Sequence, residues 1–385
     1  MQLPEWCYRI KPEQAVLAGS LLLSLVALVD DPVINRDGML YLTVARDIID
    51  QGPAVATDRF SWPFLPLLLA LGGWVTGLDP APVATAYSVL SVALLCIAGV
   101  RIARRINPDW TWTAAVFVLC APAFNAYRPD LLRDTGAWAM LMLALDQLLL
   151  WLESHRGRYA ASFQASLAAA FLFRPEMAFL CGAVPLWIAS RYPPAQWLRV
   201  LAVLFGGLML GATAGLAIVW LADIGLMGRF HRIASLLNLP ARVPDFEDTA
   251  RQMARMHLSK HAVGDAGHIL LAGLLSLIVF KWVHVTSIFS VPLAYALSRR
   301  DAFAYRGLFV SSLLVFMIVL ALFVTWKMYL SSRYVVPLAL LSLPWVCAGI
   351  RALGDRFPGR RWRALAGSLA LLLALSGVIS TTPGK

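Results

Sequence analysis

Long uninterrupted runs of apolar residues recur along most of this chain. Residues 15–29, 200–222 and 307–325 are three such runs, and each is long enough to cross an apolar layer of about 30 Å as a helix. Because no small-residue cleavage site follows the first run and further runs come after it, we interpret it as a retained signal-anchor. The predicted spans lie at about 15–30, 83–100, 110–127, 135–152, 160–173, 177–190, 200–222, 284–298, 307–325, 334–350 and 364–380. The pattern therefore predicts an all-α, polytopic membrane protein of about eleven transmembrane helices.

Two further apolar segments, about 63–78 and 267–283, are ambiguous by hydropathy, and the basic residues decide how we treat them. Cytoplasmic loops of membrane proteins retain an excess of Lys and Arg. If neither segment crosses, about half of the 33 basic residues fall in short loops on one side, which is then the inside. Making 63–78 a span would put the Arg101–Arg105 cluster outside. We therefore place both segments on the outer surface, with the N-terminus inside and the C-terminus outside.

Composition supports the membrane assignment and limits the partners. Of the 385 residues, 59% are hydrophobic and 14% are charged, whereas a soluble protein covers its surface with more polar groups. A net charge of +11 would suggest nucleic acid in a soluble protein, but no stripe of basic residues interleaved with aromatics is present, so we expect no nucleic-acid partner. Residues 1–385 form one predicted transmembrane domain, with outer-face juxtamembrane helices at about 38–51, at 63–78 and in the loop region 223–283.

The first predicted outer segment carries the carboxylate of greatest interest. This segment leads from Asp30 through Arg36 and Asp37 into an amphipathic helix. Asp37 and Tyr41 are four residues apart, so they fall on one face of that helix. An aspartate at the start of a helix is also an ordinary N-cap, favoured there by the exposed N–H groups. The sequence alone leaves both interpretations of Asp37 open.

Three later outer turns, at residues 127–134, 173–176 and 327–334, also bring charge to the membrane surface. Charges this close to hydrocarbon are costly unless they are paired or used. Neighbours such as Arg133 and Asp134 could simply pair with each other. Converging arginines and carboxylates would instead suit an anionic lipid headgroup beside an acid or a base. The candidate site residues in these turns are Arg128, Asp130, Arg133, Asp134, Arg174, Glu176, Lys327, Arg333 and Tyr334.

In order and topology, residues 10–350 resemble the GT-C class of membrane glycosyltransferases, which includes protein mannosyltransferases and aminoarabinose transferases. Such enzymes take sugars from polyprenyl-phosphate carriers at the outer face. Each motif is short, and their order along the chain carries the resemblance. The first pair is Arg-Asp here, where protein mannosyltransferases have Asp-Glu. The matching residues are Arg36-Asp37-Gly38 with Tyr41, the Pro-rich segment Trp62–Leu68, Arg128 with Arg133-Asp134, Arg174-Pro175, and Arg333-Tyr334-Val335-Val336-Pro337.

The resemblance implies a transferase with a polyprenyl-phosphate-linked sugar as donor and a lipid, a glycan or a protein as acceptor. Asp37 would be the general base on the acceptor hydroxyl, in a displacement that inverts the anomeric carbon. Arg333 and Lys327 are the first candidates for neutralising the phosphate. The wider set of expected substrate-binding residues is Arg36, Tyr41, Arg128, Asp130, Arg133, Asp134, Arg174, Glu176, Lys327, Arg333 and Tyr334.

The same resemblance bears on cofactor and location. The resemblance leaves the cofactor open: no cofactor is certain, and Asp37 and Asp130 are candidate ligands of a divalent cation, Mg²⁺ or Mn²⁺. The expected location is the inner (plasma) membrane, with the protein in contact with membrane lipids. The site would face the periplasm or another extracytoplasmic space, because the arginine-rich loops mark the opposite side as cytoplasmic.

Three other functional interpretations remain open. An O-antigen polymerase or ligase would use lipid diphosphate donors and would depend on Arg251, Arg255 or His257 more than on Asp37. A lipid or solute transporter would carry ionisable residues within its spans, where Asp146 is the exception here, and inverted repeats are not evident. A purely structural subunit would leave the outer charges unexplained. The i, i+4 pair His257 and His261 suits a metal, but without a His-Glu-x-x-His frame we favour a basic helix facing headgroups.

Overall fold

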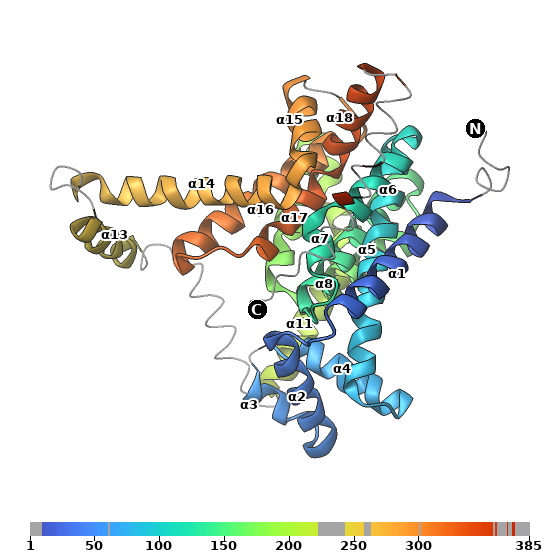
Figure 1. The fold of residues 1–385 in the computed structure, drawn as a ribbon, viewed down its shortest axis with the longest axis vertical. Coiled ribbons are helices and arrows are strands. Elements are labelled where there is room, and N and C mark those ends of the chain that lie inside the picture. The colour runs from blue at the N-terminus through green and yellow to red at the C-terminus, as the bar shows by residue number, and fades with distance from the viewer. Residues whose placement is uncertain are drawn as a thin grey trace.

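The structure of the chain is a computed structural model that describes residues 10–60, 62–221, 243–257, 263–299 and 302–356, with the isolated positions 359, 368, 372 and 373. Within these residues all regular secondary structure is helical, which confirms the all-α part of the predicted fold class (Figure 1). The α-helices are α1 (Pro12–Asp30), α2 (Arg36–Gln51), α3 (Val55–Arg59), α4 (Phe64–Thr76), α5 (Pro80–Ile106), α6 (Thr111–Cys120), α7 (Pro122–Ala126), α8 (Arg133–Ser154), α9 (Gly157–Phe173), α10 (Leu180–Arg191), α11 (Pro194–Leu221), α13 (Val243–His257), α14 (Ala266–Thr286), α15 (Ser290–Arg299), α16 (Arg306–Lys327), α17 (Ser332–Leu341) and α18 (Leu343–Arg356). Short 3₁₀ helices cover Pro108–Trp110 (η2), Pro175–Phe179 (η3), Val263–Asp265 (η4) and Ser287–Phe289 (η5).

Among the described residues, six helical segments are long and apolar enough to cross a membrane, which is compatible with a multi-pass membrane protein. A seventh is the pair α17 and α18, which bends by 62° at Ser342. The predicted count of about eleven spans is therefore not confirmed. The six segments are Pro12–Asp30, Pro80–Ile106, Arg133–Ser154, Pro194–Gly215, Val263–Arg299 and Arg306–Lys327.

The difference in span count has local physical causes. The predicted span 110–127 is broken before Pro122, whose ring cannot continue the hydrogen-bond ladder, so it forms the short helices α6 and α7. The predicted span 160–173 becomes the 17-residue α9, and 177–190 begins in the 3₁₀ helix η3 and continues as the 12-residue α10. The last predicted span, 364–380, falls almost entirely outside the described residues.

The two ambiguous apolar segments behave differently. Segment 63–78 forms α4, a 13-residue apolar helix that is shorter than the roughly 20 residues a span needs. Segment 267–283, which we expected to lie apart from the span 284–298, joins it in one candidate span of 37 residues, Val263–Arg299. Within 267–298 one candidate span takes the place of one predicted span, and the sides inferred from the arginines stay a prediction.

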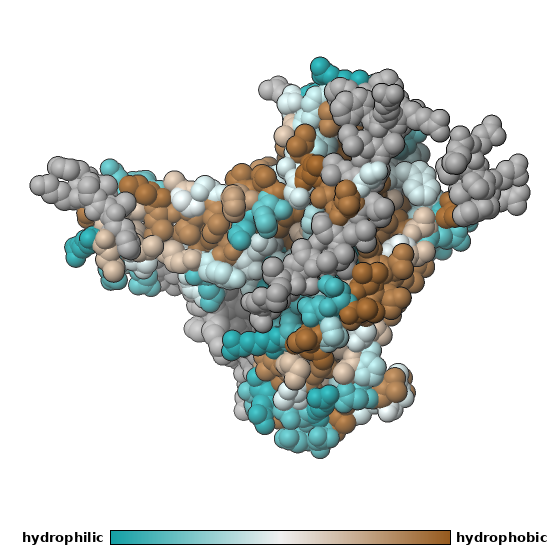
Figure 2. All heavy atoms as spheres, in the orientation of Figure 1, coloured by the Kyte–Doolittle hydropathy of each residue, from teal (hydrophilic) through white to brown (hydrophobic). Residues whose placement is uncertain are grey.

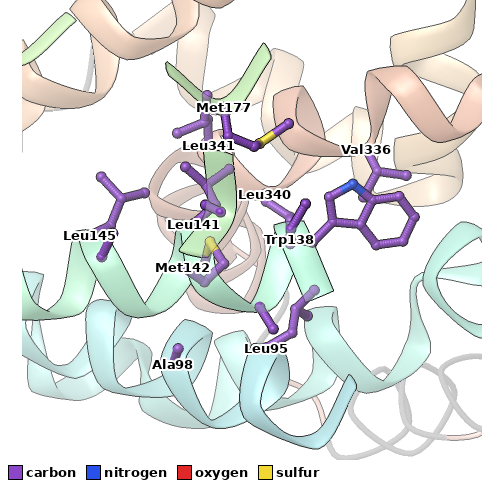
Figure 3. Packing of buried hydrophobic residues seen from close by; sticks show 14 of the residues in the cluster. Leu95, Ala98, Trp138, Leu141, Met142, Leu145, Met177, Val336, Leu340 and Leu341 are labelled. Atoms are coloured by element: carbon purple, nitrogen blue, oxygen red, sulfur yellow. The ribbon is translucent and has the colours of Figure 1, made fainter. Parts of the chain in front are cut away.

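Helix α8 lies in the centre of the bundle and packs on α5, α9 and α17. The close view in Figure 3 shows its Trp138, Leu141, Met142 and Leu145 interlocking with side chains of α5, η3 and α17. By contrast, α11 is mostly exposed, and α14 projects from the bundle with α13 at its far end (Figure 1). Exposed apolar side chains such as Phe280 follow α14, and Figure 2 shows this arm as a mostly hydrophobic surface. Apolar surfaces of this extent suit contact with lipid.

Candidate functional site

Asp37 is the second residue of α2, and the neighbouring Asn35 caps this helix. The Asn35 Oδ1 accepts a hydrogen bond from the Gly38 N–H at 3.2 Å. The interpretation of Asp37 as the N-cap is therefore wrong, because another side chain fills that position. Asp37 still lies in the first turn, where the helix dipole favours an anion. Its carboxylate is free of the capping role and available for other contacts.

The start of α2 is held close to the turn that precedes α8. Asn35 Oδ1 also accepts a hydrogen bond from the Leu131 N–H at 3.2 Å. A Cβ atom added at Gly38 would lie 2.9 Å from the Leu131 Cβ, which is closer than real side chains approach. Glycine at this position therefore permits the contact between the two segments. One asparagine and one glycine set the position of Asp37 relative to α8.

Asp37 forms an ion pair with an arginine that lies 296 positions later in the chain. The Arg333 Nη1 lies 2.7 Å from the Asp37 Oδ2, and the two side chains are 27% and 40% exposed. Arg333 is the second residue of α17, so the pair brings the N-terminal ends of α2 and α17 together. Both groups remain within reach of a ligand from solvent.

A second ion-pair group lies beside the first and is centred on Arg174. The Arg174 Nη1 lies 2.9 Å from the Asp134 Oδ1, and its Nε donates to the Glu176 Oε1 at 2.6 Å. The guanidinium also lies 4.5 Å from the centroid of the Tyr334 ring. Burial alone would lower the pKa of Arg174, but the charges of Asp134 and Glu176 outweigh it and hold that pKa above its usual value. Arg174 and Asp134 are both buried and paired with each other. This group therefore holds the neighbouring segments in place and leaves little charge to bind a ligand.

Arg133, the first residue of α8, has different surroundings. Its guanidinium lies 5.8 Å from the centroid of the Phe60 ring, and that ring meets Tyr41 edge-on at 5.5 Å. In the described part of the chain, no carboxylate lies within ion-pair distance of Arg133, and Asp134 pairs with Arg174 instead. A weakly engaged arginine is a candidate ligand for an anionic group.

Tyr41 is close to the charged groups of both helix starts. Burial is the largest cause of a rise in the pKa of Tyr41 to about 12, which the charge of Arg133 opposes and that of Asp37 reinforces. The phenol therefore stays neutral at ordinary pH. A neutral hydroxyl among these charges can donate or accept a hydrogen bond but does not act as a base.

Arg128 does not join this cluster in the described structure. It is almost fully buried, and its Nη1 donates to the Ser20 and Ser24 hydroxyls at 3.0 Å. Its Nε donates to the Asn125 Oδ1 at 2.7 Å. This arginine therefore fastens α1 to the segment after α7, so the geometry gives it a structural role in place of the expected contact with substrate.

The remaining predicted site residues occupy the edges of the site. Lys327 is exposed at the end of α16, with its Nζ 3.5 Å from the Trp326 ring centroid. Arg36 is exposed at the first position of α2, and Asp130 is buried in the turn before α8. The described residues contain no cluster of three or more His, Cys, Asp or Glu side chains able to hold a metal ion. A divalent cation on Asp37 and Asp130 stays a prediction.

Two residues that matter here were missed by sequence reasoning. Asn35 organises the start of α2, and its signal was available because asparagine is a preferred N-cap residue. Phe60 lies beneath the Arg133 guanidinium, and no local pattern marked it, because the contact joins the end of α3 to the start of α8.

Two of the residues that favoured the rival functions, Arg251 and Asp146, form ion pairs elsewhere in the structure. Arg251 on α13 pairs with Glu247 at 2.9 Å and Asp248 at 3.5 Å within its own helix. His261 lies outside the described residues, so the His257–His261 pair stays a prediction. Asp146, in the middle of the predicted span 135–152, pairs with Arg101 and Arg105.

The N-terminal ends of α2, α8 and α17 thus meet around an accessible carboxylate and two arginines that are not fully buried. Such an arrangement can take a proton from a hydroxyl and can neutralise an anionic group beside it. No protein-family model matches the chain, and no curated protein shows significant sequence similarity to it.

Proposed function

We propose that this chain is a membrane glycosyltransferase that moves a sugar from a polyprenyl monophosphate to an acceptor hydroxyl. The observation that carries the proposal is the pairing of the accessible Asp37 with Arg333, next to the weakly engaged Arg133. A carboxylate and two cations at the meeting point of three helix starts match a reaction that needs a base and releases a phosphate. The ordered resemblance to GT-C enzymes adds independent support.

The reaction that these residues would perform is one direct displacement. The acceptor oxygen attacks the anomeric carbon, the bond from that carbon to the phosphate oxygen breaks, and polyprenyl phosphate leaves with the bonding electrons. Asp37 takes the proton of the acceptor hydroxyl and later returns it to water. Because attack comes from the face opposite the phosphate, the anomeric configuration inverts. No covalent intermediate between sugar and protein is needed.

The geometry changes which arginines we propose for the phosphate. Arg333 keeps its place, and Arg133 joins it because, among the described residues, no carboxylate forms an ion pair with it and its guanidinium lies over the Phe60 ring. Arg174 is occupied by Asp134 and Glu176, and it would position the site through the ring of Tyr334. The positive ends of the helix dipoles of α2, α8 and α17 would add to the attraction for the phosphate.

We also propose that the site faces the extracytoplasmic side of the inner membrane. The support is the charge distribution: Arg101, Arg104 and Arg105 lie at the end of α5, and the topology puts that end on the arginine-rich side, opposite Asp37. A donor with a long lipid tail would then reach the site from the membrane, and a lipid, glycan or protein acceptor from the aqueous side.

The direct test is a transfer assay with the purified full-length protein in detergent. Polyprenyl-monophosphate sugars are supplied with extracts of cell-envelope acceptors, and released polyprenyl monophosphate is measured by mass spectrometry. Release that depends on acceptor, with an inverted anomeric linkage in the product, is expected. A matched set of polyprenyl-diphosphate sugars is the control that separates this proposal from the polymerase or ligase. Turnover of the diphosphate donors alone would overturn the proposal.

A further inference from the structure

The ion pair of Asp37 with Arg333 joins two groups whose proposed tasks require them to separate. Asp37 must present a carboxylate oxygen to the acceptor, yet its Oδ2 is held by the Arg333 Nη1 at 2.7 Å. Arg333 must face the phosphate, yet one of its N–H groups is turned toward Asp37. The observed arrangement is therefore suited to the protein without substrate more than to the reacting complex.

We propose that this ion pair is a latch that the donor phosphate opens. The phosphate takes the guanidinium of Arg333 away from Asp37, and the released carboxylate then accepts the proton of the acceptor hydroxyl. This inference rests on the proposed function. The latch adds an order of binding to the proposed reaction: the lipid donor binds first, and the base becomes available to the acceptor only afterwards.

Exposure and charge favour this exchange of partners. The pair is partly open to solvent, and open ion pairs contribute little free energy, so a competing anion can replace the carboxylate. The donor phosphate is a diester with one negative charge, and its two non-bridging oxygens can accept two parallel N–H bonds from one guanidinium. It thus offers Arg333 a bidentate contact in place of the single contact with the Asp37 Oδ2.

The neighbouring ion pair shows what a fixed contact looks like at the same site. The side chains of Arg174 and Asp134 are 6% and 3% exposed, and Arg174 also binds Glu176 and lies on the ring of Tyr334. A ligand cannot reach that pair without unpacking the turn. Because Asp134 is committed to Arg174, the phosphate is the partner left for an Arg333 that has released Asp37.

The latch makes a prediction opposite to that for an ordinary binding residue: removing the charge of Asp37 should strengthen phosphate binding. Affinity for a short-chain polyprenyl monophosphate is measured on the full-length protein in detergent. Asp37→Asn is expected to bind about threefold more tightly than wild type, because the competing anion is gone. Arg333→Ala should bind about tenfold more weakly. Asp37→Ala serves in the same way if the Asn variant does not fold.

A second ion pair on α2 supplies the matched control. The Arg46 Nε lies 3.0 Å from the Asp79 Oδ2, and both side chains are about half exposed. Asp79→Asn removes one carboxylate charge in the same way and should leave affinity for the phosphate unchanged. The corresponding polyprenol and inorganic phosphate are run alongside. If Asp37→Asn also binds inorganic phosphate more tightly than wild type does, the latch responds to the phosphate alone. If Asp37→Asn binds the uncharged polyprenol more tightly than wild type does, the latch is overturned.

The outcomes for the latch and for the transferase are separable. Equal or weaker phosphate binding by Asp37→Asn would overturn the latch, even if the same variant has lost transfer. Tighter binding by Asp37→Asn in a protein that transfers no sugar from any polyprenyl-monophosphate donor would support the latch and remove the transferase. Tighter binding together with loss of transfer is the result that both proposals predict.

Discussion

The bundle holds arginines and carboxylates at both ends of α8, but the two groups differ in how completely they are satisfied. At the far end, Asp146 is fully buried and contacts Arg101 at 3.1 Å and Arg105 at 2.8 Å, and Arg105 also reaches Glu153 at 2.9 Å. At the near end, the Asp37–Arg333 pair is partly exposed, and Arg133 lies over Phe60. The first group ties α5 to α8, whereas the second leaves charge available.

This difference indicates which group is structural and which is functional. A buried charge that keeps all its partners stabilises one arrangement of helices, and removing one partner leaves the others uncompensated. A charge that stays accessible at a membrane protein's surface, without full pairing, costs free energy unless a ligand uses it. The two groups should therefore respond to substitution in opposite ways: loss of folding at Asp146, and loss of function at Asp37 and its neighbours.

The largest loss of stability is expected from Asp146→Asn. This change leaves Arg101 and Arg105 beside a neutral, buried amide. Removing one partner of a buried ion pair lowers the free energy of unfolding by about 3 kcal/mol or more. Yield and unfolding temperature of the detergent-purified protein are the measurements. Glu153→Gln, at a side chain that is 35% exposed, is the control and should cost much less. Equal unfolding temperatures for Asp146→Asn and wild type would show that the far group does not stabilise the fold.

A smaller structural effect is expected where α18 crosses α15. A Cβ atom at Gly349 would overlap the backbone carbonyl of Pro292, which cannot move aside as a flexible side chain can. Gly349→Ala should therefore destabilise the protein by about 1–3 kcal/mol. Gly354→Ala on the same helix meets no atom within 4 Å and should be neutral or slightly stabilising. Matched unfolding curves for the two variants would contradict this close packing of the helices.

Near Asp37, Arg133→Ala should change function and leave stability alone. Loss of one charge-assisted contact to the phosphate is expected to weaken donor binding about tenfold, which corresponds to roughly 1.4 kcal/mol. Arg133→Lys keeps the charge but not the flat, forked guanidinium, and should recover part of the affinity. Donor affinity is measured by titration of the detergent-purified protein. Unchanged affinity in Arg133→Ala would remove Arg133 from the phosphate site.

The smallest effect is expected from Tyr41→Phe. Because burial raises the pKa of Tyr41 to about 12, the phenol stays protonated from pH 6 to pH 9 and contributes no titration there. The variant should keep the shape of the pH profile of transfer and lose less than about tenfold in rate. A changed profile would show that the hydroxyl takes part in proton transfer.

The sequence predicted helices and their order better than it predicted partners. Apolar runs found the helical class, whereas the alternation of sides inferred from the arginines stays a prediction. The sequence patterns did not predict contacts between distant segments. One alternative paired Asp134 with the adjacent Arg133, but in the structure Asp134 pairs with Arg174, the residue just before η3.

The sequence also did not predict which of the arginines would be buried. Arg333 was a first candidate for the phosphate and Arg128 a member of the wider substrate-binding set, and each follows an apolar run and precedes another. Which one is buried depends on where serines of α1 lie: Ser20 and Ser24 face Arg128 and hold it inside the bundle. No pattern near Arg128 itself encodes this contact, so burial had to be seen in the structure.

The rate of sugar transfer by Asp37→Asn, per folded molecule, tests the contrast between the two ends most directly. It is compared with wild type at equal unfolding temperature, with Asp79→Asn as the control. Loss of a general base should reduce the rate at least about 100-fold while the unfolding temperature stays the same. A variant that is equally folded and transfers sugar at the wild-type rate would show that Asp37 is not the base, and would contradict a functional role for the accessible ion pair.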